Sequence, residues 1–471
     1  MSVALAITQE RPSLRQTARD VFAVVPALSF TLDRVLAQLD TLLDDDTLFQ
    51  TVKADLAKRF PRTLIDGRPS TPVEVILRLL VIKHLYHWSY AQTVHWVSDS
   101  LVLRHVCRIY FARVPDATPL LRWANLIQPE TLHAVLDHVV EFARQLKVTH
   151  GRKLRIDGTV VETNIHHPSD STLLYDGVRV LGRTLRKAKQ ILREAPPAAR
   201  KLFRDRTRSA KRQMKRIMET ARQRGDAAEQ ALHAAYQQLL EVTEAMVDQA
   251  QQVGAALHQQ TSHAARRVRE TLAHEVPLVE QVMRQTTRRV LHGEQVPARE
   301  KIVSLFEPQT AIIRKGKPGK PTEFGRVVWL DEVEGGIISR YDVLDGNPDE
   351  TAQLPPSLDH HLQMFGRPPN LLAGDRGLYA RENERYATKQ GVKHIVLPKP
   401  GAKSAKRVAY EQQRWFRAGR NWRAGIEGRI HGLKRGQGLD RCRYHGDAGM
   451  ERWVGWGVIA HDLRTIAEAT A

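Results

Sequence analysis

The sequence predicts a multidomain protein of the α+β or α/β class, in which a mixed-sheet domain is interrupted by a long helical insert. Three patterns support this prediction: helix signals from about residue 12 to 148, strand-like runs from Lys153 and again from about Lys301, and helical spacing between those runs. We therefore divide the chain into four segments: a helical N-terminal domain (1–148), a first part of the sheet domain (149–177), a basic helical insert (178–296), and the rest of the sheet domain with C-terminal helices (297–471).

The N-terminal domain contains three helix starts within about 40 residues. The run Thr71 to Glu74 combines a capping threonine, a proline at the first helical position and a glutamate at the third. The run Ser89 to Gln92 is a capping box, and Ser98 to Ser100 offers a further start. Short capped helices in succession suit a helix-turn-helix module that contacts DNA. A small bundle that only packs or dimerises is the alternative.

The insert begins with dense positive charge in Arg183 to Lys189 and Arg208 to Arg216. Its later part has an apolar seam with residues three, four or seven apart, which predicts a long helical hairpin; the seam comprises Leu232, Tyr236, Leu239, Met246, Val253 and Leu257. Direct DNA contact and a solvated spacer or dimer arm are both compatible with this pattern.

Strand character returns after the insert. We expect strands at 302–306 and 311–313, and a hairpin formed by 325–330 and 337–344 around a Glu-Gly-Gly turn. Beyond the hairpin, strands at 370–374 and 394–397 alternate with helices at 351–365 and 380–390. Strands followed by alternating helices and strands indicate a mixed sheet.

Three acidic residues, Asp157, Asp375 and Glu427, are the candidate catalytic and metal-binding residues. Each aspartate ends or interrupts an apolar strand-like run, and Glu427 lies in a segment with a helical pattern. Carboxylates from two strands and one helix make an all-oxygen site that suits hard divalent cations. Two Mg²⁺ ions about 4 Å apart activate a water and stabilise the leaving oxygen in phosphodiester cleavage. Taken singly, each aspartate also fits a capping role at a strand end.

Cationic residues share a helix face with Glu427. Because a helix turns about 100° per residue, Arg423 and Lys434 fall within about 40° of Glu427, and Arg420 lies on the same face. A carboxylate flanked by cations suits a metal together with neighbouring phosphates. An ordinary ion pair between Arg423 and Glu427 is the structural alternative.

The composition favours a polyanionic partner. Lysine and arginine exceed aspartate and glutamate by 72 − 52 = 20, and basic surplus of this size is typical of proteins that bind nucleic acid. Two cysteines exclude a disulfide framework and a cysteine-rich zinc site. No apolar run approaches the roughly 20 residues of a membrane span, and the first ten residues make a poor signal peptide. We therefore expect a cytoplasmic protein without a membrane partner, associated with the nucleoid when it is bound to DNA.

Several segments resemble bacterial insertion-sequence transposases of the DDE, RNase H-like superfamily. The segment from Thr71 to Tyr110 resembles their N-terminal helical domain, Arg155 to Ser171 the region of the first aspartate, and Ala373 to Tyr379 that of the second. Arg423, Glu427 and Lys434 match the spaced Arg, Glu and Lys around the third acid, although Arg420 replaces a tyrosine. The insert is typical of some subgroups, of which the ISNCY-type group is the most similar.

The resemblance implies a mechanism and a set of partners. The enzyme would bind double-stranded DNA at the terminal inverted repeats of its element, cleave a strand at each end, and join the freed 3′-hydroxyl to target DNA. Asp157, Asp375 and Glu427 would hold two Mg²⁺ ions, which Mn²⁺ could replace, while Arg423, Lys434, Arg376 and Arg420 would contact DNA. Pairing of two ends implies a homodimer or a larger assembly. A catalytically silent DNA-binding regulator and a metal-dependent nuclease without strand transfer are the alternatives.

Overall fold

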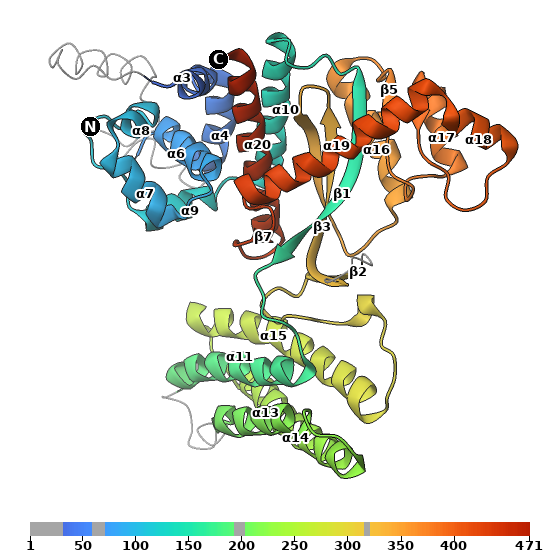
Figure 1. The fold of residues 1–471 in the computed structure, drawn as a ribbon. Coiled ribbons are helices and arrows are strands. Elements are labelled where there is room, and N and C mark those ends of the chain that lie inside the picture. The colour runs from blue at the N-terminus through green and yellow to red at the C-terminus, as the bar shows by residue number, and fades with distance from the viewer. Residues whose placement is uncertain (1–31, 59–70, 193–202, 315–320) are drawn as a thin grey trace. The chain divides into compact units, whose positions relative to one another are not determined.

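The computed structural model describes residues 32–58, 71–192, 203–314 and 321–471. The chain forms two compact units (Figure 1). Unit 1 comprises residues 1–162 and 326–471, and unit 2 comprises residues 163–325. The first ten residues, in which we looked for a signal peptide, lie outside the described residues.

The first part of unit 1 is helical. Its helices are α3 (Arg34–Leu42), α4 (Asp46–Lys58), α6 (Val73–Leu85), α7 (Tyr90–Asp99), α8 (Leu101–Val106), α9 (Ala117–Ala124) and α10 (Pro129–Gln145). The capping box predicted at Ser89 is confirmed, because Ser89 and Gln92 satisfy each other's backbone N–H groups at the start of α7. Ser100 caps α8, as predicted.

Helix α6 differs from the expected amphipathic helix. Pro72 is its N-cap residue, and no side chain caps it, so the capping role predicted for Thr71 is wrong. All residues from Val73 to Leu85 are buried, which includes the ionisable side chains of Arg78 and Lys83. A helix that is buried on all sides lies inside a core rather than on its surface.

A mixed sheet forms the rest of unit 1. Its strands are β1 (Lys153–Thr163), β3 (Thr322–Val333), β4 (Ile337–Leu344), β5 (Leu371–Ala373), β6 (His394–Val396) and β7 (Arg441–Cys442). The strands follow the order β4-β3-β1-β5-β6, and β7 also pairs with β1. Strands β3 and β4 are the predicted antiparallel hairpin, and β1, β5 and β6 run parallel to one another.

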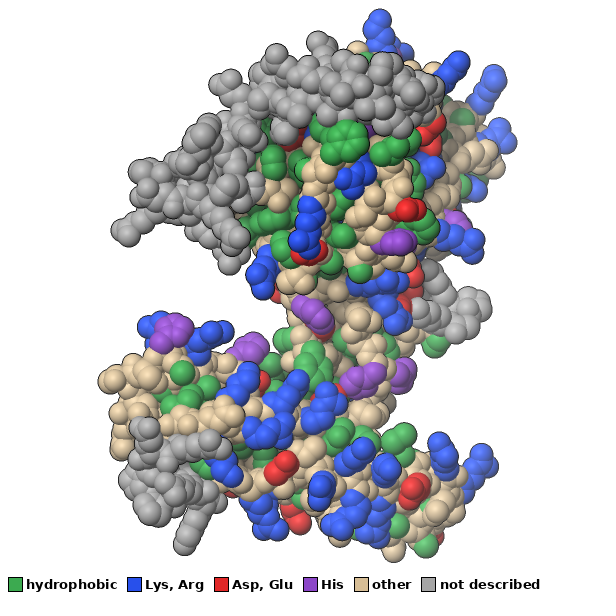
Figure 2. Space-filling view, turned by 90° about the vertical axis from the view of Figure 1, so that its left-hand side faces the viewer, with side chains coloured by type: hydrophobic (Ala, Val, Ile, Leu, Met, Phe, Trp, Pro, Cys, Tyr) green, Lys and Arg blue, Asp and Glu red, His purple; other side chains and the backbone are tan. Residues whose placement is uncertain are grey.

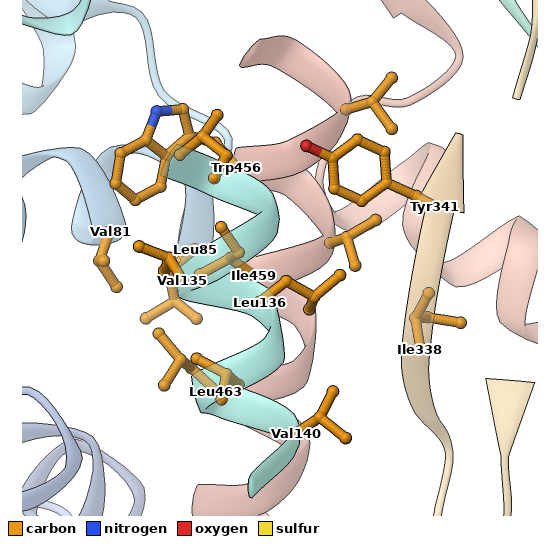
Figure 3. Close-up of a cluster of buried hydrophobic side chains, with 14 of the residues drawn as sticks. Val81, Leu85, Val135, Leu136, Val140, Ile338, Tyr341, Trp456, Ile459 and Leu463 are labelled. Atoms are coloured by element: carbon orange, nitrogen blue, oxygen red, sulfur yellow. The ribbon is translucent and has the colours of Figure 1, made fainter. Parts of the chain in front are cut away.

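Helices accompany this sheet in the second half of unit 1. They are the 3-10 turn η4 (Glu350–Gln353) and the helices α16 (Leu354–Phe365), α17 (Arg381–Lys389), α18 (Ala405–Gln412), α19 (Arg414–Gly436) and α20 (Asp447–Thr470). The last helix joins the two ends of the chain into one core. Side chains of α20, including Trp456, Ile459 and Leu463, pack with residues of α6, α10 and β4 (Figure 3).

Unit 2, residues 163–325, contains the segment 178–296 that was predicted as the helical insert. Its elements are α11 (Asp170–Ile191), α13 (Thr207–Thr220), α14 (Asp226–Leu257), α15 (His263–Thr286), the π-helical turn η2 (Thr287–Leu291), the 3-10 turn η3 (Ala298–Glu300) and β2 (Ala311–Arg314). The apolar seam predicted for the hairpin lies on α14, where Leu239, Met246 and Val253 are fully or almost fully buried. These residues form a core of their own with α11, α13 and α15.

The strand predicted at 302–306 is wrong. These residues form an irregular loop in which Ser304 accepts backbone N–H groups of Phe306 and Glu307, and Phe306 stays 43% exposed. A short apolar run does not distinguish a strand from a loop that covers a helix pair. Within the described ranges, the helices include none with the length and apolar character that crossing a membrane requires.

Candidate active site

Asp157 lies on β1, and Asp375 lies just beyond the end of β5, the parallel strand that pairs with β1. Arg155 of β1 is opposite Ala373 of β5, and each aspartate follows two residues later. Strand β5 ends at Ala373, so Asp375 begins the next loop, whereas Asp157 is still within β1. The parallel register therefore brings together the backbones of two acids that are 375 − 157 = 218 residues apart in the sequence.

Arg423 links the first acid to the third. From helix α19, its Nη2 donates to Oδ2 of Asp157 at 2.8 Å, and its Nη1 donates to Oε1 of Glu427 at 3.4 Å. Asp157 and Arg423 are 16% and 17% exposed at their side chains, whereas Glu427 is 73% exposed. The ion pair between Arg423 and Glu427, which was the structural alternative, is present. It is longer and more exposed than the pair between Arg423 and Asp157 on β1.

Asp157 and Glu427 contact a cation that the chain itself supplies. The guanidinium of Arg423 contacts both carboxylates. Carboxylate oxygens are also the ligands that Mg²⁺ prefers. Among the residues that the structure describes, no three His, Cys, Asp or Glu side chains are grouped closely enough to hold a metal ion. The metal-binding role of the three acids stays a prediction.

The loop after β5 orients Asp375. Its Oδ1 accepts the backbone N–H groups of Gly377 at 2.9 Å and Leu378 at 3.2 Å. Glu350 of η4 packs against this loop. A Cβ built on Gly377 would contact Oε2 of Glu350 and would lie 3.2 Å from Oδ1 of Asp375. Glu350 could not be selected from the sequence, since the stretch that precedes it has the composition of a surface turn.

A buried arginine fixes helix α19 against the sheet. Arg155 donates through Nε and Nη2 to the carboxylate of Glu332 on β3, at 2.8 and 2.5 Å, and through Nη1 to the backbone carbonyl of Trp422. Its guanidinium also lies 4.8 Å from the centre of the Trp422 ring. Because Trp422 precedes Arg423, this contact sets the position from which Arg423 reaches Asp157.

Further ionisable groups lie near the Arg155–Glu332 pair. Arg429 of α19 lies 3.4 Å from Glu332, so two arginines face one carboxylate. Burial raises the pKa of Asp462 well above its usual value, and burial lowers the pKa of His461 to about 4. Both neighbours are therefore biased towards their neutral forms, and the charge that balances Arg155 comes from Glu332.

The other predicted DNA-binding residues differ in their surroundings. Lys434 is partly buried and donates to the carbonyl of Val160 on β1 at 2.8 Å. Arg376 and Arg420 are exposed, Arg376 beside Asp375 and Arg420 on α19. Lys434 thus contributes a third contact between α19 and β1, while Arg376 and Arg420 are accessible to a ligand.

Sequence reasoning missed Arg155 and Glu332, although one signal was present. Residues two apart in a strand share a face, so Arg155 must lie on the same side of β1 as Asp157. A cation on the face of a candidate catalytic acid, within an otherwise apolar strand, is unusual unless it is paired. Trp453 and Trp456 belong to the core, whereas Trp422 is partly exposed and contacts Arg155.

One family model matches the chain. Residues 28–126 match the model described as a transposase domain, DUF772. The match lies on the helical first part of unit 1 and supports a transposase. Comparisons with curated proteins and with solved structures found no match.

Proposed function

We propose that the chain is a DDE transposase that cleaves the 3′ ends of its own insertion sequence and joins them to target DNA. The observation that carries the proposal is the arrangement of the three acids. Asp157 lies on β1, Asp375 lies two residues beyond the end of the adjacent parallel strand β5, and Arg423 joins Asp157 to Glu427 on α19. The match of residues 28–126 to a transposase domain supports the same class of protein independently.

The sheet supports an RNase H-like catalytic domain. That fold places an antiparallel hairpin beside a central strand and parallel strands on its other side, which is the order β4-β3-β1-β5-β6. The central strand and its parallel neighbour carry the two aspartates, as the resemblance implies. The ISNCY-type subgroup stays part of the proposal through the long insert between β1 and β3.

The proposed roles follow from the contacts. Two bound Mg²⁺ ions would supply an activated water and a charge that stabilises the leaving 3′ oxygen. Asp157, Asp375 and Glu427 would hold the ions, and Arg423 would turn from Asp157 towards a phosphate of the DNA. Nε of Arg423 is buried and has no hydrogen-bond partner among the described residues, so its present pairing leaves a donor unused. Arg376 and Arg420 would contact the DNA backbone from the surface.

Cleavage of end-labelled DNA tests the proposal. The substrate is a duplex that carries the terminal repeats flanking the chain's own coding sequence, incubated with Mg²⁺ or with EDTA. We expect Mg²⁺-dependent nicking at the end and joining to a second duplex, both lost in Asp157→Asn, Asp375→Asn and Glu427→Gln. Glu382→Gln is the matched control, because Glu382 is an exposed acid on α17 to which none of the proposed roles is assigned.

The outcomes separate the alternatives. Nicking without joined products would favour a nuclease that lacks strand transfer. Tight binding of the ends without cleavage under Mg²⁺ or Mn²⁺ would favour a catalytically silent DNA-binding protein. Nicking at the wild-type rate by any of the three acid variants would remove that residue from the site.

A further inference from the structure

The helical insert contains a basic groove that none of the roles above uses. The groove has a volume of about 570 Å³ and lies between α11 and α15, with the loop of Leu305 and Phe306 at its edge. Arg183, Arg186 and Lys187 line it from α11, and Thr271, His274 and Glu275 line it from α15. All these residues belong to unit 2.

The cations of the groove form one stripe. Arg179, Arg183, Arg186 and Lys187 are all exposed, and their spacing of four, three and one residues keeps them on one face of α11. Eight residues of helix rise by about 12 Å, which spans three to four phosphates of one DNA strand at about 3.4 Å each. Figure 2 shows Lys and Arg side chains spread over the face of unit 2 that it presents. Three of the four cations of the stripe line the groove.

An exposed aromatic ring orders this stripe. Phe306 is 43% exposed, and the guanidinium groups of Arg183 and Arg179 lie 5.7 and 6.0 Å from the centre of its ring. Cation–π contacts of this kind hold an arginine in place without neutralising its charge. Arg183 therefore presents its full charge to the groove in a restricted orientation.

The one acid that lines the groove is held by a neighbouring hydroxyl. Oε2 of Glu275 accepts the hydroxyl of Thr184 at 2.8 Å; burial raises the pKa of Glu275, and this hydrogen bond and the charge of Arg183 oppose that shift. Arg186 contacts Asp205 at 3.5 Å, but both side chains are about 60% exposed, and ion pairs of that kind are weak and easily exchanged. Three cations in the groove thus remain accessible to a stronger anionic partner.

We propose that this groove binds the phosphodiester backbone of duplex DNA, as a contact separate from the three-acid site. The inference rests on the proposed function only in taking DNA as the ligand. It assigns the insert a binding role instead of that of a spacer or dimer arm. Phosphate contacts of this kind position a protein on DNA without reading its sequence.

Two matched triple variants test the groove. Arg183→Gln, Arg186→Gln and Lys187→Gln remove three positive charges from the groove, and Arg208→Gln, Lys211→Gln and Arg212→Gln remove the same number from exposed positions of α13. The affinity of each full-length protein for a fluorescent 40-base-pair duplex is measured by anisotropy from about 50 to 200 mM salt. Each lost phosphate contact lowers the slope of log affinity against log salt by about 0.9.

We expect the groove variant to lose about 2 to 3 units of slope, and the α13 variant less than 1. Phe306→Leu should weaken binding by a few-fold with little change in slope, because it frees Arg183 but leaves the charge in place. Equal effects of the two triple variants on the slope would overturn the proposal. Far-ultraviolet circular dichroism should be unchanged in both, because all six substituted residues are exposed.

Nicking assays keep this inference apart from the proposed function. At saturating DNA, the groove variant should nick within a few-fold of the wild-type rate, because the three acids are intact. Wild-type nicking together with unchanged DNA binding by the groove variant would reject the groove and leave the transposase standing. Loss of slope in the groove variant, with full nicking by Glu427→Gln, would reject the catalytic site and leave the groove. Absence of duplex binding by the wild type would reject both.

Discussion

The guanidinium of Arg155 fills the space that a side chain at position 425 would need. A Cβ built on Gly425 would lie 2.6 Å from Nη1 of Arg155, the nitrogen that donates to the carbonyl of Trp422. Glycine is unfavourable inside a helix, by about 1 kcal/mol relative to alanine, so its presence in α19 needs a reason. The reason here is the close approach of β1 and α19.

Gly425→Ala should therefore impair the enzyme even though alanine favours helices. The added methyl group displaces Arg155 or the helix, and we expect a loss of about 1 to 3 kcal/mol in stability together with slower nicking. Gly428→Ala is the control, since nothing lies within 4 Å of a Cβ at that position of the same helix. It should raise the free energy of unfolding by about 0.5 to 1 kcal/mol. Denaturant titration and nicking rates measured on both variants decide the matter, and equal behaviour would refute the steric argument.

Arg423→Gln should separate metal binding from DNA positioning. Arg423 donates to Asp157 at 2.8 Å and so competes with a metal ion for that carboxylate. We expect the half-saturating Mg²⁺ concentration to fall by several-fold, while nicking at saturating Mg²⁺ slows by about tenfold or more because a phosphate is held less well. Arg420→Gln, an exposed cation of the same helix, should leave the Mg²⁺ requirement unchanged. A Mg²⁺ titration of nicking that is the same for Arg423→Gln and the wild type would contradict this role.

Arg78→Ala should strongly destabilise the helical first part of unit 1. The Arg78 side chain is fully buried and contacts Asp40 at 2.6 Å, Asp44 at 2.6 Å and Glu74 at 3.1 Å. Removal of one partner from a buried ion network costs about 3 to 5 kcal/mol, because the remaining charges lose their compensation. Arg113→Ala breaks an exposed pair with Asp116 and should cost less than about 1 kcal/mol. Thermal unfolding of the two variants compares these costs, and similar values would argue against a structural network.

Lys83 makes the stability of the folded state depend on pH. Burial lowers the pKa of Lys83 to about 7, from a usual value of 10.5, and its ammonium group is surrounded by the rings of Tyr90, Tyr444 and Trp453. Between about pH 7 and 10.5 the unfolded state binds more protons, so the free energy of unfolding rises with pH across this window. A shift of this size corresponds to on the order of 5 kcal/mol.

Lys83→Met should remove this dependence. We expect the variant to be more stable than the wild type at pH 7, and to show a flatter profile between pH 7 and 10 in urea titrations. Lys389→Met, which changes an exposed lysine on α17, should retain the wild-type slope. An unchanged slope in Lys83→Met would show that other groups titrate in this range.

The parts of the fold with local signals could be predicted from the sequence. Ser89 and Ser100 predict the starts of α7 and α8, because a capping side chain bonds to a backbone N–H group only three residues away. The seam that includes Leu239 and Met246 predicts the hairpin because helical spacing is a local property. The location of Asp375 just after a strand was also predicted, because the apolar run that forms β5 lies immediately before it in the sequence.

The arrangement of the site could not be predicted in the same way. The link from Arg423 to Asp157 depends on tertiary packing between residues 423 − 157 = 266 positions apart, whereas helix periodicity showed only the local pair of Arg423 with Glu427. Arg78 and Lys83 are charged residues of the kind that usually lie at the surface, so their burial within α6 could not be predicted from the sequence. Their partners on other elements explain it. The loop at 302–306 kept the apolar residues of a strand because they cover helices.

The position of the insert also sets the order in which the protein can fold. The described partner strands of β1 are β3, β5 and β7. The first of them begins at Thr322, so 322 − 163 − 1 = 158 residues separate it from the end of β1. A ribosome that adds 5 to 20 residues per second needs roughly 8 to 32 s to synthesise that stretch. During this time β1, the strand that carries Asp157, has no partner strand with which to pair, while the helices of the insert can already form their own core. The nascent chain would therefore acquire its basic helical unit well before it completes the proposed catalytic site.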